Sequence, residues 1–152
     1  MTENIKDVFG KKLLFFDGAM GTQLQARGLQ AGELPEVWNL THKDDILSIH
    51  RAYIAAGCDI LKTNTFGANP IKYADGKYDV SSLVRAGIAA AREAADEADR
   101  KVYVAHSIGP LGKLLKPIGE LDFEDAVDAF KAAVKAGDMV KEKKAPAHIN
   151  IE

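Results

Sequence analysis

LLFFDGAMGTQLQARG, residues 13–28, is the stretch that decides the fold class of this 152-residue chain. The four apolar residues 13–16 predict a short buried strand, and the small residues after Asp17 predict a turn into a helix. A carboxylate at the exit of a buried strand costs folding free energy unless it binds a ligand or stabilises the turn. Strand, turn and helix in this order predict an α/β unit.

Two further apolar strands are predicted over residues 58–62 and 102–105, which gives three βα units and a parallel sheet. Asp79 and Asp122 are the expected N-caps of the last two helices, and Gly57 and Gly137 are expected helix ends. The expected inward residues are Ile46, Ile49, Tyr53 and Ile54 in the first helix, Leu83, Val84, Ile88, Ala91 and Ala95 in the second, and Phe123, Val127, Phe130 and Val134 in the third.

The composition is that of a soluble globular protein, with 47% hydrophobic and 28% charged residues and a net charge of −2. This balance argues against a nucleic-acid partner, because no basic surplus exists to neutralise phosphates. No apolar run approaches the roughly 20 residues of a membrane span, and MTENIKDVFG has no signal-peptide core. The one cysteine, Cys58, is expected in the core and fits a reducing, cytoplasmic location.

Polar residues follow all three predicted strands, where α/β folds place their ligands. They are Asp17-Gly18, Thr63-Asn64-Thr65 and His106-Ser107. A single polar residue at a strand exit commonly does no more than cap a loop. Three such groups in register favour a binding site.

Three segments together resemble the homocysteine S-methyltransferase family. They are FDGAMGTQLQARGL (16–29), LPEVWNLTHKDDILSIHRAYIAAGCDILKTNTFGAN (34–69) and IGPLGKLLKPIGELDFEDAVDAFK (108–131). Within the family, the likeness is to the homocysteine-binding domain of bacterial cobalamin-dependent methionine synthases, and it runs from about residue 11 to 137. It implies a (β/α)8 TIM barrel, of which this chain holds about the first three βα units and an irregular C-terminal tail.

The resemblance also implies a reaction. A zinc ion held by three cysteine thiolates lowers the pKa of the homocysteine thiol, and the resulting thiolate attacks a methyl group, which methylcobalamin delivers in the close relatives. L-homocysteine is then the small-molecule partner. The family's zinc cysteines lie on later strands, so we expect no metal ligand and no catalytic residue in this chain, and no activity without the rest of a methionine synthase.

The resemblance implies a substrate pocket at the strand ends. Its expected residues are Asp17, Gly18, Ala19 and Met20 after the first strand, Thr63, Asn64 and Thr65 after the second, and Ser107 with Gly109-Pro110 after the third. Backbone N–H groups of the first loop suit a carboxylate, and Gly18 allows close approach. Asp17 either orients the ligand's ammonium or the loop, or accepts bonds from its own turn. Relatives commonly have threonine where this chain has Leu111.

The resemblance stops where a fourth strand should begin. Residues 1–137 therefore form the expected N-terminal part of the homocysteine-binding domain, and residues 138–152 form a divergent tail, whose origin is a truncation, a frame shift or an incomplete gene model. His42, His50, His106 and His148 have no metal-ligand spacing. We expect marginal stability, because the inward faces of Leu13, Phe15, Ile60 and Val104 are only partly covered.

Two other classes remain as alternatives. The first is a non-catalytic partial barrel that binds an amino acid or oligomerises through its open sheet edge. The second, a small phosphate-binding α/β domain, is disfavoured because no P-loop or G-x-G-x-x-G follows any predicted strand.

Overall fold

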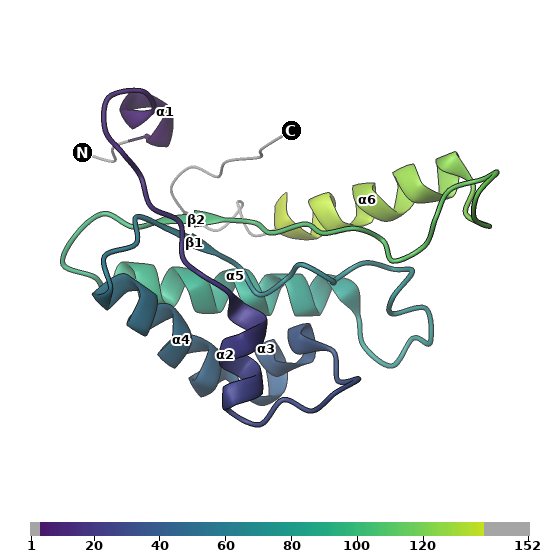
Figure 1. The fold of residues 1–152 in the computed structure, drawn as a ribbon, viewed down its shortest axis with the longest axis horizontal. Helices are drawn as coiled ribbons and strands as arrows, with labels where there is room; N and C mark the ends of the chain where they lie inside the picture. Colours follow the sequence, from purple (N-terminus) through teal and green to yellow (C-terminus); the bar gives the residue numbers. More distant parts are fainter. Residues whose placement is uncertain (1–3, 139–152) are drawn as a thin grey trace.

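A computed structural model describes residues 4–138, in which helices surround a small parallel sheet (Figure 1). The helices are α1 (Ile5–Val8), α2 (Met20–Ala26), the 3-10 helix η1 (Pro35–Val37), α3 (Trp38–Thr41), α4 (Lys43–Ala55), α5 (Val80–Asp96) and α6 (Phe123–Asp138), and the strands are β1 (Ile60–Lys62) and β2 (Tyr103–Ala105). Apart from Asp138, the tail predicted over 138–152 lies outside the described residues, as does His148.

The sheet is parallel, as the sequence predicts. In the register of β1 and β2, Ile60 lies opposite Tyr103 and Lys62 opposite Ala105. The first predicted strand has the expected place but not the expected length, because it pairs with β1 through a single parallel bridge between Phe16 and Ile60. Leu13, at its start, is 75% exposed, so no neighbouring layer stabilises an extended segment there.

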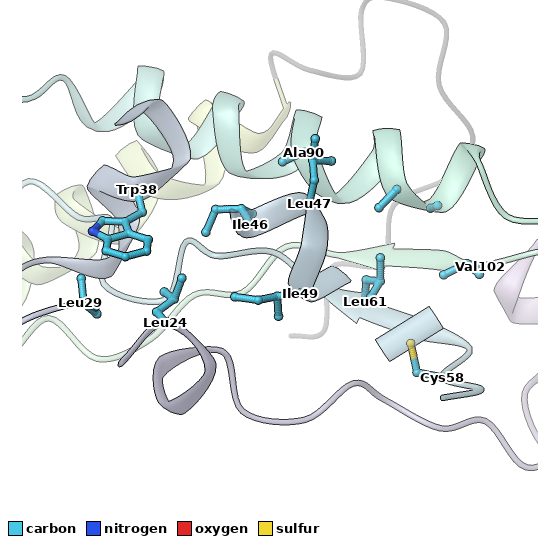
Figure 2. Packing of buried hydrophobic residues seen from close by; sticks show 12 residues of the cluster. Leu24, Leu29, Trp38, Ile46, Leu47, Ile49, Cys58, Leu61, Ala90 and Val102 are labelled. Atoms are coloured by element: carbon cyan, nitrogen blue, oxygen red, sulfur yellow. The ribbon is translucent and has the colours of Figure 1, made fainter. Parts of the chain in front are cut away.

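The two faces of the sheet pack against different helices, because successive strand residues point to opposite sides. Leu61 and Val102 face the main core, which α2, α3, α4 and α5 cover (Figure 2). Ile60 and Tyr103 face the other way and pack against Ile5 and Val8 of α1. Cys58 belongs to the main core, which confirms the prediction of a small buried residue.

Local signals predict α4 and α5 correctly. The Asp79 carboxylate accepts the Ser82 amide at 2.8 Å and caps α5, whose predicted inward residues are all buried. Gly57 follows the end of α4 with a φ of 98°, a left-handed conformation that glycine adopts without strain. Ile46 and Ile49 are buried on α4, and Tyr53 and Ile54 are partly buried against the same core.

The predicted inward face of α6 is wrong. Phe123 is 66% exposed and Phe130 is 39% exposed, and Val127 and Val134 are only partly buried. The buried face consists of small residues, namely Ala126, Ala129, Ala133, Ala136 and Gly137. These small side chains bring α6 close to its neighbours, including α5, whereas large apolar residues would hold it away.

Gly137 does not end α6, because the helix is described through Asp138. A Cβ atom at Gly137 would lie 2.5 Å from the His106 Nδ1 atom, so the glycine makes room for the imidazole ring that follows β2. Asp122 precedes α6 as predicted, and its carbonyl accepts the amide of Ala126.

The expected incomplete cover of the inward faces is confirmed for three residues and wrong for the fourth, Ile60. Leu13 and Phe15 are exposed, and Val104 is partly buried. Ile60 is fully buried, because Ile5 and Val8 of α1 pack on it. The four-residue helix α1 thus covers this face of the sheet, which the apolar pattern of the strands alone does not predict.

Two glycine substitutions should change stability in opposite directions. Alanine is favoured over glycine in a helix by about 1 kcal/mol. A Cβ atom at Gly87, within α5, would lie 2.7 Å from Asn39 Nδ2 and 2.8 Å from Thr65 Cγ2, whereas Gly21 in α2 has open space around it. We expect Gly87→Ala to lower the free energy of unfolding by about 1–3 kcal/mol and Gly21→Ala to raise it by up to about 1 kcal/mol.

Urea unfolding followed by circular dichroism measures both changes. A Gly87→Ala variant as stable as Gly21→Ala would contradict the close packing described between α5, Asn39 and Thr65.

Candidate functional site

The loops after β1 and β2 meet at the carboxyl end of the sheet through a chain of hydrogen bonds. The Thr65 hydroxyl donates to the carbonyl of Ser107 at 2.7 Å, and the Ser107 amide donates to Thr63 Oγ1 at 3.0 Å. The two threonine hydroxyls are 2.6 Å apart, and since the Thr65 proton is already used, Thr63 is the donor between them. Three predicted site residues are therefore together, and the two threonine hydroxyls are satisfied by each other and by the backbone of Ser107.

Asp17 joins this edge from the first strand segment. Its side chain is buried, and Oδ2 accepts the backbone amide of Lys62 at 3.1 Å. Oδ1 lies 3.6 Å from Lys62 Nζ and has no hydrogen-bond partner among residues 4–138. Burial raises the pKa of Asp17, and the contacts with Lys62 oppose that rise. The Asp17 carboxylate is thus hydrogen-bonded to the last residue of β1.

Gly18, Ala19 and Met20 lead from Asp17 into α2. The Tyr53 hydroxyl of α4 donates to the carbonyl of Ala19 at 2.9 Å. A Cβ atom at Gly18 would lie 2.8 Å from the Tyr53 hydroxyl oxygen, so this glycine is required for the ring to pack on the loop. Gly18 and Ala19 remain exposed, while Met20 packs partly on the main core.

Asn64 is turned toward the helices. Its Nδ2 donates to the carbonyl of Pro35 at 2.8 Å and to Asn39 Oδ1 at 2.9 Å. Asn39 Nδ2 in turn donates to the carbonyls of Asn64 and Leu83. This buried pair of amides joins η1, α3 and α5 to the loop after β1, in which Thr63 and Thr65 are also buried.

Glu36 is a buried residue that the sequence did not single out. Its Oε1 accepts the Gly67 amide at 2.6 Å and its Oε2 accepts the Tyr73 hydroxyl at 2.9 Å. Burial, followed by the charge of Glu36, raises the pKa of Tyr73 far above its ordinary value. The Glu36 carboxylate holds both ends of the loop 67–73, which follows the predicted site residues 63–65 after β1.

The loop after β2 forms the third side. The Gly109 amide donates to the carbonyl of Phe66 at 2.9 Å, which ties this loop to the one after β1. Leu111 is buried against Ala126 and Ala129 of α6. Burial lowers the pKa of His106, and the nearby Asp138 opposes this effect.

The described residues of this chain do not fit a zinc site. Residues 4–138 contain no group of three or more His, Cys, Asp or Glu side chains arranged to hold a metal ion. The one thiol, Cys58, is buried at the other end of β1, and burial raises its pKa, which disfavours the thiolate that binds zinc. In the same described part of the chain, no helix is long and apolar enough to cross a membrane.

A parallel sheet with polar groups gathered at its carboxyl edge is typical of α/β proteins, which commonly bind ligands at that edge. The sequence profile of the homocysteine S-methyltransferase family matches residues 14–147, and the chain belongs to this family. The expected family is thereby confirmed.

Curated relatives include two methionine synthases. The chain is 39% identical over 145 residues to that of Mycobacterium tuberculosis and 36% identical over 142 residues to that of Mycobacterium leprae. These matches cover 86% and 84% of this chain but only 12% and 11% of the relatives' length.

Solved structures of the homocysteine methyltransferase MmuM from Escherichia coli share the fold. The oxidized form superposes with a TM-score of 0.72 at 23% identity, over 90% of this chain and 53% of that one. The metallated form gives a TM-score of 0.71 at 22% identity, over 90% of this chain and 54% of that one. The chain is thus a mixed α/β fold that matches about half of a homocysteine methyltransferase.

Proposed function

We propose that this chain is the N-terminal part of a (β/α)8 homocysteine-binding domain of the methionine synthase type. The complete domain transfers a methyl group to the homocysteine thiolate and makes methionine. The observation that carries the proposal is the meeting of strand-end loops at one edge, where Ser107 N bonds Thr63 Oγ1 and Asp17 bonds Lys62. The family match and the methionine synthase relatives support the reaction.

The proposed substrate pocket lies along this edge and binds the amino-acid end of L-homocysteine. Its residues are Asp17, Gly18, Ala19, Met20, Thr63, Asn64, Thr65 and Ser107. The exposed backbone of Gly18 and Ala19 would face the ligand, and the buried hydrogen bonds of Thr63, Thr65 and Asn64 would fix the wall beside it.

Zinc and methylcobalamin belong to the proposal at the level of the family. Zinc would supply activation of the homocysteine sulfur, and the methyl donor would be bound by other domains of a methionine synthase. Among residues 4–138 no donor set suits zinc, and the role proposed for this chain is to bind and orient the substrate. We expect it to be inactive alone.

Binding and turnover of the purified chain test this proposal separately. We expect saturable binding of L-homocysteine in an NMR titration, with shifts at residues 17–20, 63–65 and 107, and no methyl transfer from methylcobalamin in the presence of zinc. 2-Mercaptoethanol, which keeps a thiol but lacks the amino-acid end, is the control ligand and should not shift these residues. Robust turnover by this chain would overturn its inactivity, and absence of homocysteine binding would overturn the pocket.

A non-catalytic module that oligomerises is the second candidate, and exposed apolar residues beside the sheet favour it. Phe15 is 57% exposed, and Leu13 and Phe16 are exposed with it at the edge next to β1. An edge of this kind is a common site of association. Light scattering measures the mass in solution, and a clean monomer over a range of concentrations counts against this candidate.

A further inference from the structure

Most polar side-chain atoms of the predicted site residues are already hydrogen-bonded or buried, so few of them can bind a charged ligand. The hydroxyls of Thr63 and Thr65 bond each other and Ser107, and the Asn64 amide bonds Pro35 and Asn39. The Asp17 side chain is only 2% exposed. A ligand that approaches this edge therefore meets few of these polar atoms directly.

Lys62 is the charged residue that this edge presents to solvent. It is the last residue of β1, and its side chain is 44% exposed. Because Leu61 points into the helix-covered core, Lys62 points to the opposite face of the sheet, the face of Ile60. On this face α1 covers Ile60, and Lys62 lies beyond it at the carboxyl end.

Asp17 holds Lys62 in place at two points. Oδ2 accepts the Lys62 amide at 3.1 Å, and Oδ1 lies 3.6 Å from Lys62 Nζ. An ammonium group has three N–H donors, so the contact with Asp17 leaves donors for a second anion. The buried carboxylate compensates part of the charge and restrains the flexible lysine stem, which lowers the entropy cost of binding an anion.

We propose that Lys62 is a specificity-determining residue that binds the carboxylate of the amino-acid substrate, with Asp17 as its positioning residue. This inference rests on the proposed function and adds an exposed charged side chain to a pocket whose other polar side chains are largely buried. It makes the free carboxylate of homocysteine a recognised group.

Calorimetric titration of the full chain with L-homocysteine and with its methyl ester tests the assignment. The ester keeps the ammonium and the thiol but has no negative charge. We expect the unaltered chain to bind the acid about fivefold more tightly than the ester, the upper end for a partly exposed ion pair. Lys62→Met should bind the acid about fivefold more weakly and the ester unchanged.

Lys131→Met is the matched control, because Lys131 is an exposed lysine on α6 and pairs with Asp128 on the same helix. It should bind both ligands like the unaltered chain, and circular dichroism verifies that each variant is folded. If the unaltered chain bound the acid and the ester with equal affinity, the proposed role of Lys62 would be overturned while the proposed function would stand. This comparison requires no variant. Absence of any homocysteine binding would overturn the proposed function with it.

Discussion

The free energy of unfolding of this chain should fall by about 3 kcal/mol between pH 7 and pH 4 because of His50 alone. His50 lies on the buried face of α4, and its side chain is fully buried. Neither ring nitrogen has a hydrogen-bond partner within residues 4–138. Burial lowers the pKa of His50 from 6.5 to about 4, since nothing there compensates the charged imidazolium.

The direction of the effect follows from proton binding in the two states. Between pH 6.5 and about 4 the unfolded chain binds a proton at His50 and the folded chain does not. The contribution of His50 to the free energy of unfolding is therefore fully present above pH 6.5. It decreases as the pH falls toward about 4 and levels off below that pH.

Two variants separate the titration of His50 from its burial. His50→Gln keeps a polar group but cannot titrate. The decrease of about 3 kcal/mol in its free energy of unfolding between pH 7 and pH 4 should therefore disappear. His50→Leu should lose the decrease as well and gain about 1 kcal/mol at pH 7, because unpaired polar atoms leave the core. Urea unfolding at half-unit pH steps measures both, and an unaltered pH profile in His50→Gln would contradict the assignment.

Glu36→Ala should destabilise the chain by about 3 kcal/mol or more at pH 7. Removal of the carboxylate leaves the Gly67 amide and the Tyr73 hydroxyl buried without their acceptor. Each unpaired buried group costs about 1–3 kcal/mol, and the cavity left by the side chain adds to the loss. The loop after β1 should loosen first, because both contacts hold it.

Glu120→Ala is the control for Glu36→Ala, because Glu120 is exposed and should change stability by no more than about 0.5 kcal/mol. Tyr73→Phe removes one of the two donors and should cost about 1 kcal/mol. Equal unfolding midpoints for Glu36→Ala and Glu120→Ala would show that the buried network contributes nothing.

The sequence predicts those parts of the fold that depend on neighbouring residues. The Asp79 cap requires an amide three residues away, and the end of α4 requires only a glycine that adopts a positive φ. Both signals act within one turn of helix, so the pattern of residues contains them. The order of the three parallel segments likewise follows from the repeat of strand and helix.

The inward face of α6 could not be predicted in this way. Phe123 and Phe130 are the largest apolar residues of that helix, and a pattern weighted by size places them inside. The structure instead buries the alanine face, because the helix packs closely and the space beside it fits only small side chains. The distance between two packed helices depends on the side chains of both. The apolar periodicity of one helix therefore cannot predict it.

The structure brings several predicted site residues together, and it adds contacts that the sequence did not predict. The family resemblance led to Asp17, Thr63 and Ser107, and the structure brings them to one edge. It gave no sign of Glu36, whose two partners lie 31 and 37 residues away. Lys62 was visible only as the end of a strand, and its pairing with Asp17 depends on how two strands lie side by side.

The stacking of Trp38 on His42 provides the chain with an optical reporter. Trp38 is the one tryptophan of the sequence, it is buried, and its ring lies 4.0 Å from that of His42. Tryptophan fluorescence, excited selectively, therefore reports on the junction of α3 and α4, next to the Asn39 contacts that hold α5 and the loop after β1. An emission change that precedes the loss of helical signal would reveal this junction opening before the rest of the chain.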